Sequence, residues 1–166
     1  MVRFLLKRLV LSISIILLIS GCSYKFVKGG DVSVFIIPIQ NSTLMPQLDI
    51  SLTEEIKNIF NKNPGFNLVY SKEQADISIN IDVKKLVRRP LFYSKGDISE
   101  VVSGRFSVEA EATIYKRGEE VSKDTIKESL AFPLSVIYKE EDMLKNISEK
   151  FAKRIYFWLL DKYENE

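Results

Sequence analysis

The chain has 166 residues, with 24 lysine and arginine against 22 aspartate and glutamate residues, no histidine and one cysteine. This length fits one globular domain, and the near balance of charge argues against nucleic-acid binding, which depends on an excess of basic residues. A single cysteine permits neither an internal disulfide nor a thiolate cluster, and the lack of histidine removes the commonest general base and transition-metal ligand. We therefore expect no enzymatic activity, no metal and no cofactor.

The first residues of the chain have the pattern of a secretory signal that ends at the cysteine. Basic residues precede an apolar run over residues 9–19, which is too short to span a bilayer comfortably. The segment closes with the letters ISGC, the order of a branched residue, two small residues and cysteine that forms a bacterial lipobox. We predict a lipoprotein signal peptide over residues 1–21, lipidation with palmitate at Cys22, and a tether over residues 22–30. An ordinary signal peptide or a signal anchor is the alternative.

Lipidation would determine where the protein resides. Several acyl chains on Cys22 would hold the domain on a membrane without spanning it, since one chain alone binds only marginally. Ser23 follows the cysteine where aspartate would signal retention in the inner membrane. By analogy with that sorting rule, we expect a lipid-anchored protein on the periplasmic side of the outer membrane.

The first part of the domain has a strand, a helix and a second strand. Residues 32–39 form an apolar run that ends near a proline, which is typical of a strand buried on both faces. Apolar residues then recur at helical spacing over residues 50–62, and the letters NPG end that helix. Residues 66–70 are a short strand candidate.

The central part contains the clearest strands. Apolar and polar residues alternate over residues 77–84 and again over residues 106–115, so each strand has a core face and a polar face. A tight turn at residues 116–119 leads to a third strand over residues 121–132. Between the first two strands, residues 85–102 are predicted to form a long loop, and long loops are often functional.

The last element is a helix over residues 140–162, with acidic residues in its first turn and one long apolar stripe that predicts a core face. Together the elements predict an α+β fold, a two-layer α/β sandwich in which two helices pack on one face of a four- to five-stranded, mostly antiparallel sheet. A single domain over residues 31–166 would contain all of it.

Several short segments resemble the LptE family of lipopolysaccharide-assembly lipoproteins. They are CSY at residues 22–24, PIQNST at residues 38–43, which fits a P-x-x-N-x-T pattern, LT at residues 52–53 and ADISI at residues 75–79. Two residues depart from the family pattern, since Ser23 and Asn80 stand where many members have glycine. The resemblance implies an α/β sandwich that sits inside the lumen of the outer-membrane β-barrel LptD. This domain would assist assembly of the barrel and bind lipopolysaccharide.

Lipid A carries phosphates, which lysine and especially arginine bind well. Basic residues gather at and beyond the end of the strand over residues 77–84. The candidate lipopolysaccharide-binding residues are Lys84, Lys85, Arg88, Arg89, Lys95 and Arg105. The alternative is that they are simply a solvated strand end and loop, and no family motif aligns this segment.

The predicted function is therefore binding and scaffolding, with an LptD-like barrel, lipopolysaccharide and the membrane as partners. Another accessory lipoprotein of an outer-membrane channel, such as a pilotin of a secretin ring or a curli-type secretion component, could share the same order of elements. A lipid-anchored hydrolase would need a positioned nucleophile and base, and the sequence shows no arrangement that supplies them.

Overall fold

The computed structural model describes residues 32–93, 101–133 and 140–164. The predicted lipidation site Cys22, the tether and the candidate residue Lys95 lie outside the described residues. The elements in chain order are β1 (Ser33–Ile36), β2 (Gln40–Asn41), α2 (Leu48–Lys62), β3 (Asn67–Leu68), the short helix η1 (Lys72–Gln74), β4 (Ile77–Tyr93), β5 (Val101–Lys116), β6 (Glu119–Pro133) and α3 (Glu140–Glu164).

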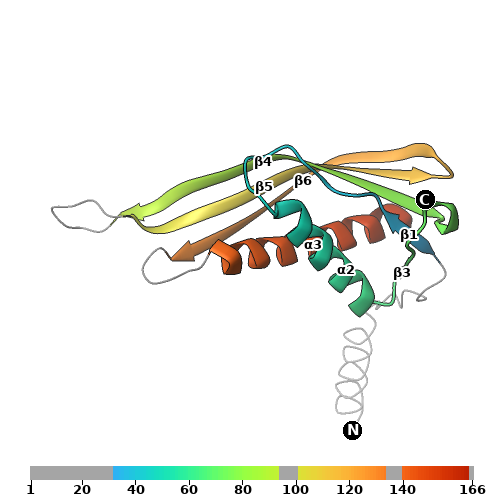
Figure 1. Ribbon diagram of the computed structural model, residues 1–166, viewed down its shortest axis with the longest axis horizontal. Coiled ribbons are helices and arrows are strands. Elements are labelled where there is room, and N and C mark those ends of the chain that lie inside the picture. The colour runs from blue at the N-terminus through green and yellow to red at the C-terminus, as the bar shows by residue number, and fades with distance from the viewer. Residues whose placement is uncertain (1–31, 94–100, 134–139, 165–166) are drawn as a thin grey trace, which may run out of the picture.

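The strands form one mixed sheet of six strands in the order β3-β1-β4-β5-β6, with β2 also paired to β4. The long strands β4, β5 and β6 form an antiparallel meander. β1 pairs in parallel with both β3 and β4, and β2 pairs in parallel with β4. β4 and β5 reach beyond the helices at one end of the molecule, whereas β6 ends near the start of α3 (Figure 1). The predicted α+β sandwich is confirmed, with a slightly higher strand number than predicted.

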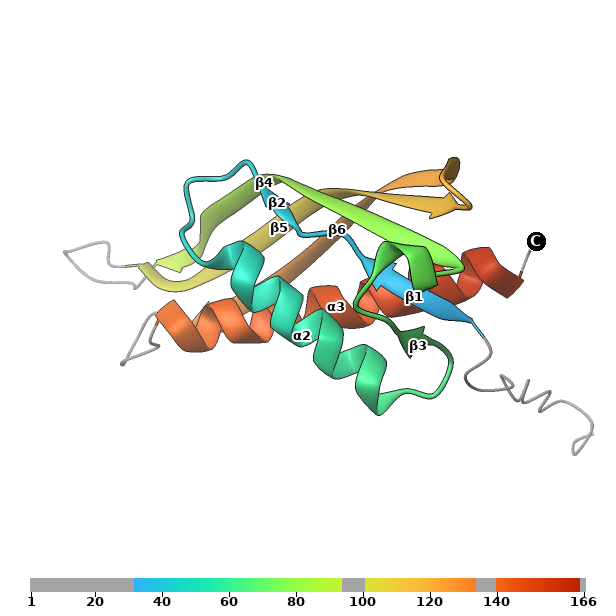
Figure 2. The ribbon, with the colours of Figure 1, turned by 45° about the vertical axis from the view of Figure 1, so that its right-hand side comes forward.

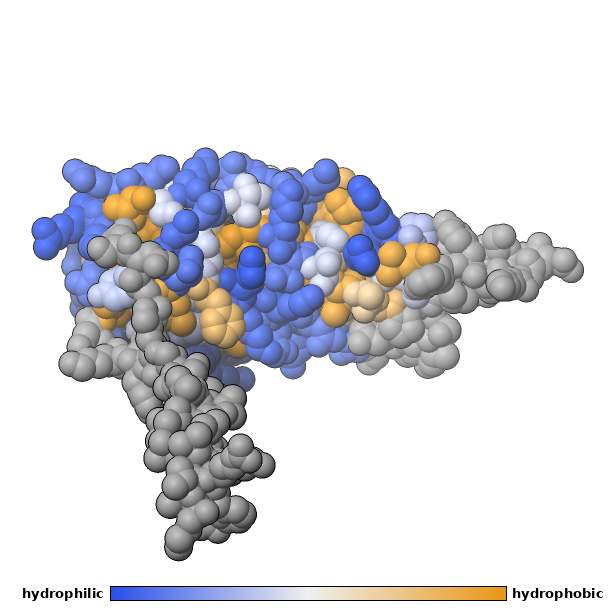
Figure 3. Space-filling model, turned by 180° about the vertical axis from the view of Figure 1, so that it is seen from behind, coloured by the Kyte–Doolittle hydropathy of each residue, from blue (hydrophilic) through white to orange (hydrophobic). Residues whose placement is uncertain are grey.

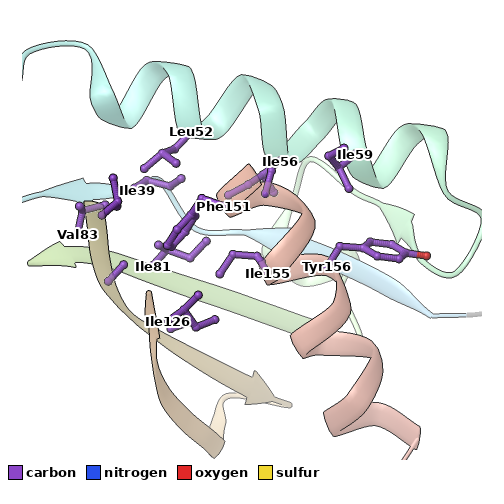
Figure 4. Close-up of a cluster of buried hydrophobic side chains, with 14 of the residues drawn as sticks. Ile39, Leu52, Ile56, Ile59, Ile81, Val83, Ile126, Phe151, Ile155 and Tyr156 are labelled. Carbon is purple, nitrogen blue, oxygen red and sulfur yellow. The ribbon is translucent and has the colours of Figure 1, made fainter. Parts of the chain in front are cut away.

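Both helices cover the same face of the sheet (Figure 2). Their apolar stripes meet the alternating apolar residues of the long strands, and Figure 4 shows this cluster around Phe151 of α3. Ile79, Ile81, Phe151 and Ile155 are completely buried. The alternation in β4 therefore separates a core face from a polar outer face, as predicted from the sequence.

Only residues 33–36 of the apolar run over residues 32–39 form a strand, β1, which ends before Pro38, and β2 begins after the run, at Gln40. Only Val34 of β1 is fully buried, so the prediction of a strand buried on both faces is wrong. β1 lies between β3 and β4, and its other residues are half-exposed. The tight turn between β5 and β6 is confirmed, since Arg117 and Gly118 both have positive φ, at 55° and 89°.

The segment over residues 85–102 is not a long loop, and this prediction is wrong. β4 continues to Tyr93, and β5 already begins at Val101. A bulge between Val83 and Lys85 shifts the register, so the simple alternation of the sequence breaks at that point. Pro90 is compatible with the strand because, beyond Val83, the described strands pair with β4 on the β5 side only.

The last helix is confirmed as one continuous element that ends two residues later than predicted. Neither α2 nor α3, the two long helices of the described ranges, has the length and hydropathy of a membrane-spanning helix.

Candidate functional site

The bulge in β4 determines which basic side chains come together on the outer face of the sheet. After the bulge, Leu86 and Arg88 lie opposite the buried residues Val108 and Phe106, so these positions belong to the core face. The alternate positions of the same strand therefore face outward. They include Lys85 and Arg89.

These outward residues line a hollow of about 410 Å³, which we call the basic groove. Its lining residues come from the three long strands and are Lys85, Val87, Arg89, Pro90, Leu91, Arg105, Ser107, Val108, Glu109 and Lys127. The ladder places Arg89 directly opposite Arg105, and it places Glu109 between Lys85 and Lys127.

The groove holds more positive charge than its own carboxylate can balance. The Lys127 ammonium lies 3.0 Å from the Glu109 carboxylate. Among the described residues, no ion-pair partner accompanies the side chains of Lys85, Arg89 or Arg105. Two like charges directly opposite each other on a sheet repel, so an anion placed between Arg89 and Arg105 would relieve that repulsion.

The chemistry of the lining suits an amphiphilic anion. Guanidinium groups bind phosphate or carboxylate through two parallel hydrogen bonds. Val87 and Leu91 add apolar surface beside these groups. A molecule with phosphates next to hydrocarbon would therefore match both parts of the groove.

Lys84 lies next to the groove, but its charge is already neutralised by carboxylates. Its ammonium forms an ion pair with Asp82 and lies 3.8 Å from the Glu111 carboxylate. The hydrogen bond to Asp82 is the main cause that raises the pKa of Lys84 above its usual value. The predicted binding role of Lys84 therefore has no support from its surroundings.

Arg88 points to the opposite face of the sheet from Arg89. Its guanidinium forms an ion pair with Glu140, at the start of α3. The same group lies 5.4 Å from the centroid of the Phe106 ring, within the range of a cation–π contact. Arg88 thus connects the sheet to the helix layer and does not join the other candidate residues. Of the six predicted residues, the structure brings together Lys85, Arg89 and Arg105.

Sequence reasoning missed Glu109 and Lys127 as parts of this site. Both lie on strands whose register is set by the tight turn at Arg117 and Gly118. Counting back from that turn would have paired the two residues to within one position. The signal was therefore present in the turn, not in any motif around the residues themselves.

No protein-family model matches this chain, and no curated protein matches it either. Solved structures do match in fold. Rare lipoprotein B from Shewanella oneidensis is 14% identical, with a TM-score of 0.52, and the match covers 80% of this chain and 97% of that one. A DUF330 protein from Xanthomonas campestris is 11% identical, with a TM-score of 0.58 and coverage of 81% and 86%.

A third similar structure is the uncharacterized lipoprotein B from Nitrosomonas europaea, which is 13% identical, with a TM-score of 0.50 and coverage of 81% of this chain and 88% of that one. At such low identities the similarity shows the fold alone. The chain therefore has a fold found among bacterial lipoproteins, which agrees with the coarser part of the sequence-based prediction.

Proposed function

We propose that this protein is a lipid-anchored lipoprotein on the periplasmic side of the outer membrane, acylated at Cys22. In this role it plugs an LptD-type β-barrel translocon, assists the assembly of that barrel and binds lipopolysaccharide on its way to the outer leaflet. It acts by binding and scaffolding, catalyses no reaction and needs no cofactor. The lipobox, the short sequence resemblance to LptE and the shared fold with bacterial lipoproteins support this proposal.

The basic groove is the observation that carries the proposal. It presents Arg89 and Arg105 side by side, without an ion-pair partner in the described part of the chain, next to the apolar side chains of Val87 and Leu91. Lipid A combines phosphates with acyl chains, and this combination matches the two kinds of surface. A sheet with a polar outer face also suits the polar interior of a large barrel.

The binding test compares the two facing arginines of the groove, Arg89 of β4 and Arg105 of β5, with Arg88, which lies on the opposite face of β4. The double variant Arg89→Ala/Arg105→Ala removes both guanidinium groups of the groove, and Arg88→Ala is the matched control on the core face. Loss of two charged hydrogen-bonding groups should weaken lipopolysaccharide binding about tenfold or more, as measured by fluorescence titration with purified lipopolysaccharide. Arg88→Ala should bind nearly as well as the parent protein. Equal losses in both variants would contradict the assignment of the groove.

The partner test is affinity purification of the acylated protein from detergent-solubilised outer membranes. A single large, heat-modifiable β-barrel in near-stoichiometric amount is the expected result. A secretin-like ring would support the alternative role as a pilotin, and a curli-type secretion channel would support the corresponding accessory role. Recovery of no membrane partner would contradict the proposed scaffolding function.

A further inference from the structure

Six large apolar side chains are exposed among the described residues, and they fall into two groups. Leu44 lies four residues before α2, and Ile50 lies in its first turn. The other four lie on β6, on the last two turns of α3 and just after β3, and we call them the aromatic pole. They are Tyr70, Val121, Phe157 and Tyr163, with exposed fractions of 88%, 43%, 62% and 43%.

Three side chains of the aromatic pole, Val121, Phe157 and Tyr163, lie on or beside the C-terminal part of α3, and Tyr70 lies two residues after β3. The Tyr163 ring lies 6.1 Å from the Phe66 ring, centroid to centroid, and the Phe157 ring lies 5.8 Å from the Tyr156 ring. On the other side, Tyr163 and Val121 line the same shallow hollow. Apolar side chains also reach the surface at this end of the molecule in the view from behind (Figure 3).

The pole has a rigid base. Tyr156 is buried, and its hydroxyl oxygen accepts a hydrogen bond from the Gly65 backbone N–H at 3.2 Å. A Cβ atom at Gly65 would come within 2.4 Å of that hydroxyl oxygen, so the loop before β3 packs tightly on α3. The rings of Phe66 and Tyr156 also stack edge to face at 5.8 Å. The exposed rings therefore rest on packed core.

The chain that precedes the described domain arrives at this same end. Ser33, the first residue of β1, pairs with Asn67, which directly follows Phe66. β1, β3 and the C-terminal end of α3 lie together at one end of the molecule (Figure 1). Cys22 precedes Ser33 by only 11 residues, so even a fully extended connection spans at most about 40 Å.

We propose that the aromatic pole is a membrane-contact surface that rests on the phospholipid bilayer at the boundary between headgroups and acyl chains. The inference rests on the proposed lipidation of Cys22. Aromatic rings with one apolar side and one wet side favour this boundary. Because the acyl anchor keeps the pole close to the bilayer, even weak partitioning of a few rings is sufficient to orient the domain.

The orientation has a consequence for the basic groove. β4 runs from Ile77, at the anchored end, to Arg89, and a strand advances about 3.3 Å per residue. With the pole on the bilayer, the guanidinium of Arg89 is held on the order of 40 Å along the sheet from the membrane contact. The anchored end and the anion-binding end of the domain are thus separated by the length of the long strands.

The experiment measures contact with lipid at single positions. The full mature protein, acylated at Cys22, is reconstituted into vesicles of phosphatidylethanolamine and phosphatidylglycerol that contain a nitroxide-labelled lipid. Separate Phe157→Cys and Tyr163→Cys variants carry a fluorophore on the introduced thiol, which is the only free one because Cys22 is the sole natural cysteine. The matched control is Leu44→Cys, at a site that is even more exposed, 103%, before the first turn of α2.

α2 is 15 residues long, so about 22 Å separate its two ends, and only its C-terminal end lies at the pole. Fluorophores at positions 157 and 163 should therefore be quenched by the nitroxide lipid at least about twofold more strongly than the fluorophore at position 44. Equal quenching at the three positions, or none, would overturn the proposal. Quenching between labelled copies in the absence of nitroxide would also overturn it, because the surface would then be an interface between copies.

Failure of the anchor is distinguishable from failure of the pole. The mass of the N-terminal peptide shows directly whether Cys22 is acylated, which tests the proposed function. If it is not, Cys22→Ser forms of the three cysteine variants, each with a single labelled thiol, are added to preformed vesicles, and stronger quenching at positions 157 and 163 than at position 44 still supports the pole. Absence of that pattern overturns the pole, whatever the state of Cys22.

Discussion

The two halves of the long sheet follow the same strand alternation, but they differ in what surrounds them. In the half under the helices, residues 77–83 of β4 pack against α2 and α3, and charges on the outer face are neutralised by neighbours such as Lys84, Asp82 and Glu111. In the half beyond the bulge, which we call the arm, the side chains of Arg89 and Arg105 have no such neighbour in the described chain. Most of the buried side chains lie in the first half, which we call the stable half, although Phe106 and Val108 of the arm are also buried. Arg89 and Arg105, unpaired among the described residues, lie on the outer face of the arm.

The largest expected effect tests where stability resides. Phe151→Ala empties a completely buried site between the helices and the sheet, and it should lower the free energy of unfolding by about 3–5 kcal/mol. Val87→Ala, the control in the arm, removes a half-buried side chain from the outer face and should cost about 1 kcal/mol or less. Urea unfolding followed by the fluorescence of Trp158, the only tryptophan, measures both. Similar losses in the two variants would contradict the division into a stable half and an arm.

The same division explains which parts of the fold were predictable. The buried positions around Ile79 and Ile81 in β4 and around Phe151 in α3 could be read from the sequence. Each of these elements keeps one regular spacing of apolar residues, two for the strand and about 3.6 for the helix. The arm does not, since one extra residue at the bulge exchanges the two faces, so that Arg88 and not Arg89 lies on the core face of the sheet. Only strand pairing decides that exchange.

The candidate binding site was predictable only in part. The sequence indicated a basic cluster near the end of the strand, and three of its residues do come together. Lys84 is neutralised by Asp82, two residues earlier, and a carboxylate at that spacing on a strand can be recognised in advance. The partner of Arg88 is Glu140, 52 residues away, and only the packing of α3 on the sheet brings the two together.

An intermediate effect tests the contact between β6 and α3 in the stable half. The indole N–H of Trp158 donates a hydrogen bond to the Asp124 carboxylate at 2.8 Å, and the Lys162 ammonium lies 2.9 Å from the same group. The hydrogen bond from Trp158, followed by that from Lys162, lowers the pKa of Asp124 below its usual value. A lowered pKa in the folded state means that this contact stabilises the protein above the ordinary aspartate pKa, near 3.9, and is lost as the pH falls through the lower folded value.

The fluorescence of Trp158 should therefore change with a midpoint below about pH 3.9 in the folded protein. Asp124→Asn, which keeps a polar group of the same size, should abolish that transition. A midpoint at or above the ordinary value, or an unchanged transition in Asp124→Asn, would show that the carboxylate is not held by the indole. Substitutions that change charge in the arm serve as the comparison, because they should leave the pH midpoint of the Trp158 fluorescence change unaltered.

The smallest expected effect is the most specific to the arm. Arg105→Glu replaces a repelling pair opposite Arg89 by an attracting one, so it should stabilise the protein by about 0.2–1 kcal/mol, while lipopolysaccharide binding falls. The control in the stable half is Lys123→Glu, whose ammonium lies 3.4 Å from the Glu111 carboxylate, and there the same exchange of charge should destabilise by a similar amount. Shifts of opposite sign in the urea midpoint are the expected result.

Shifts of opposite sign in the urea midpoints of Arg105→Glu and Lys123→Glu would show that the two halves of the sheet differ in how their charges are arranged. A surface chosen for stability alone would place an acid across from Arg89, as the half under the helices does for its own basic residues. Two facing guanidinium groups would then lower the stability of the arm slightly, and an anionic ligand that bound between them would recover that loss. If Arg105→Glu proved destabilising instead, the two guanidinium groups would be stabilised by their surroundings without a ligand. Charge repulsion would then no longer support an anion-binding site in the groove.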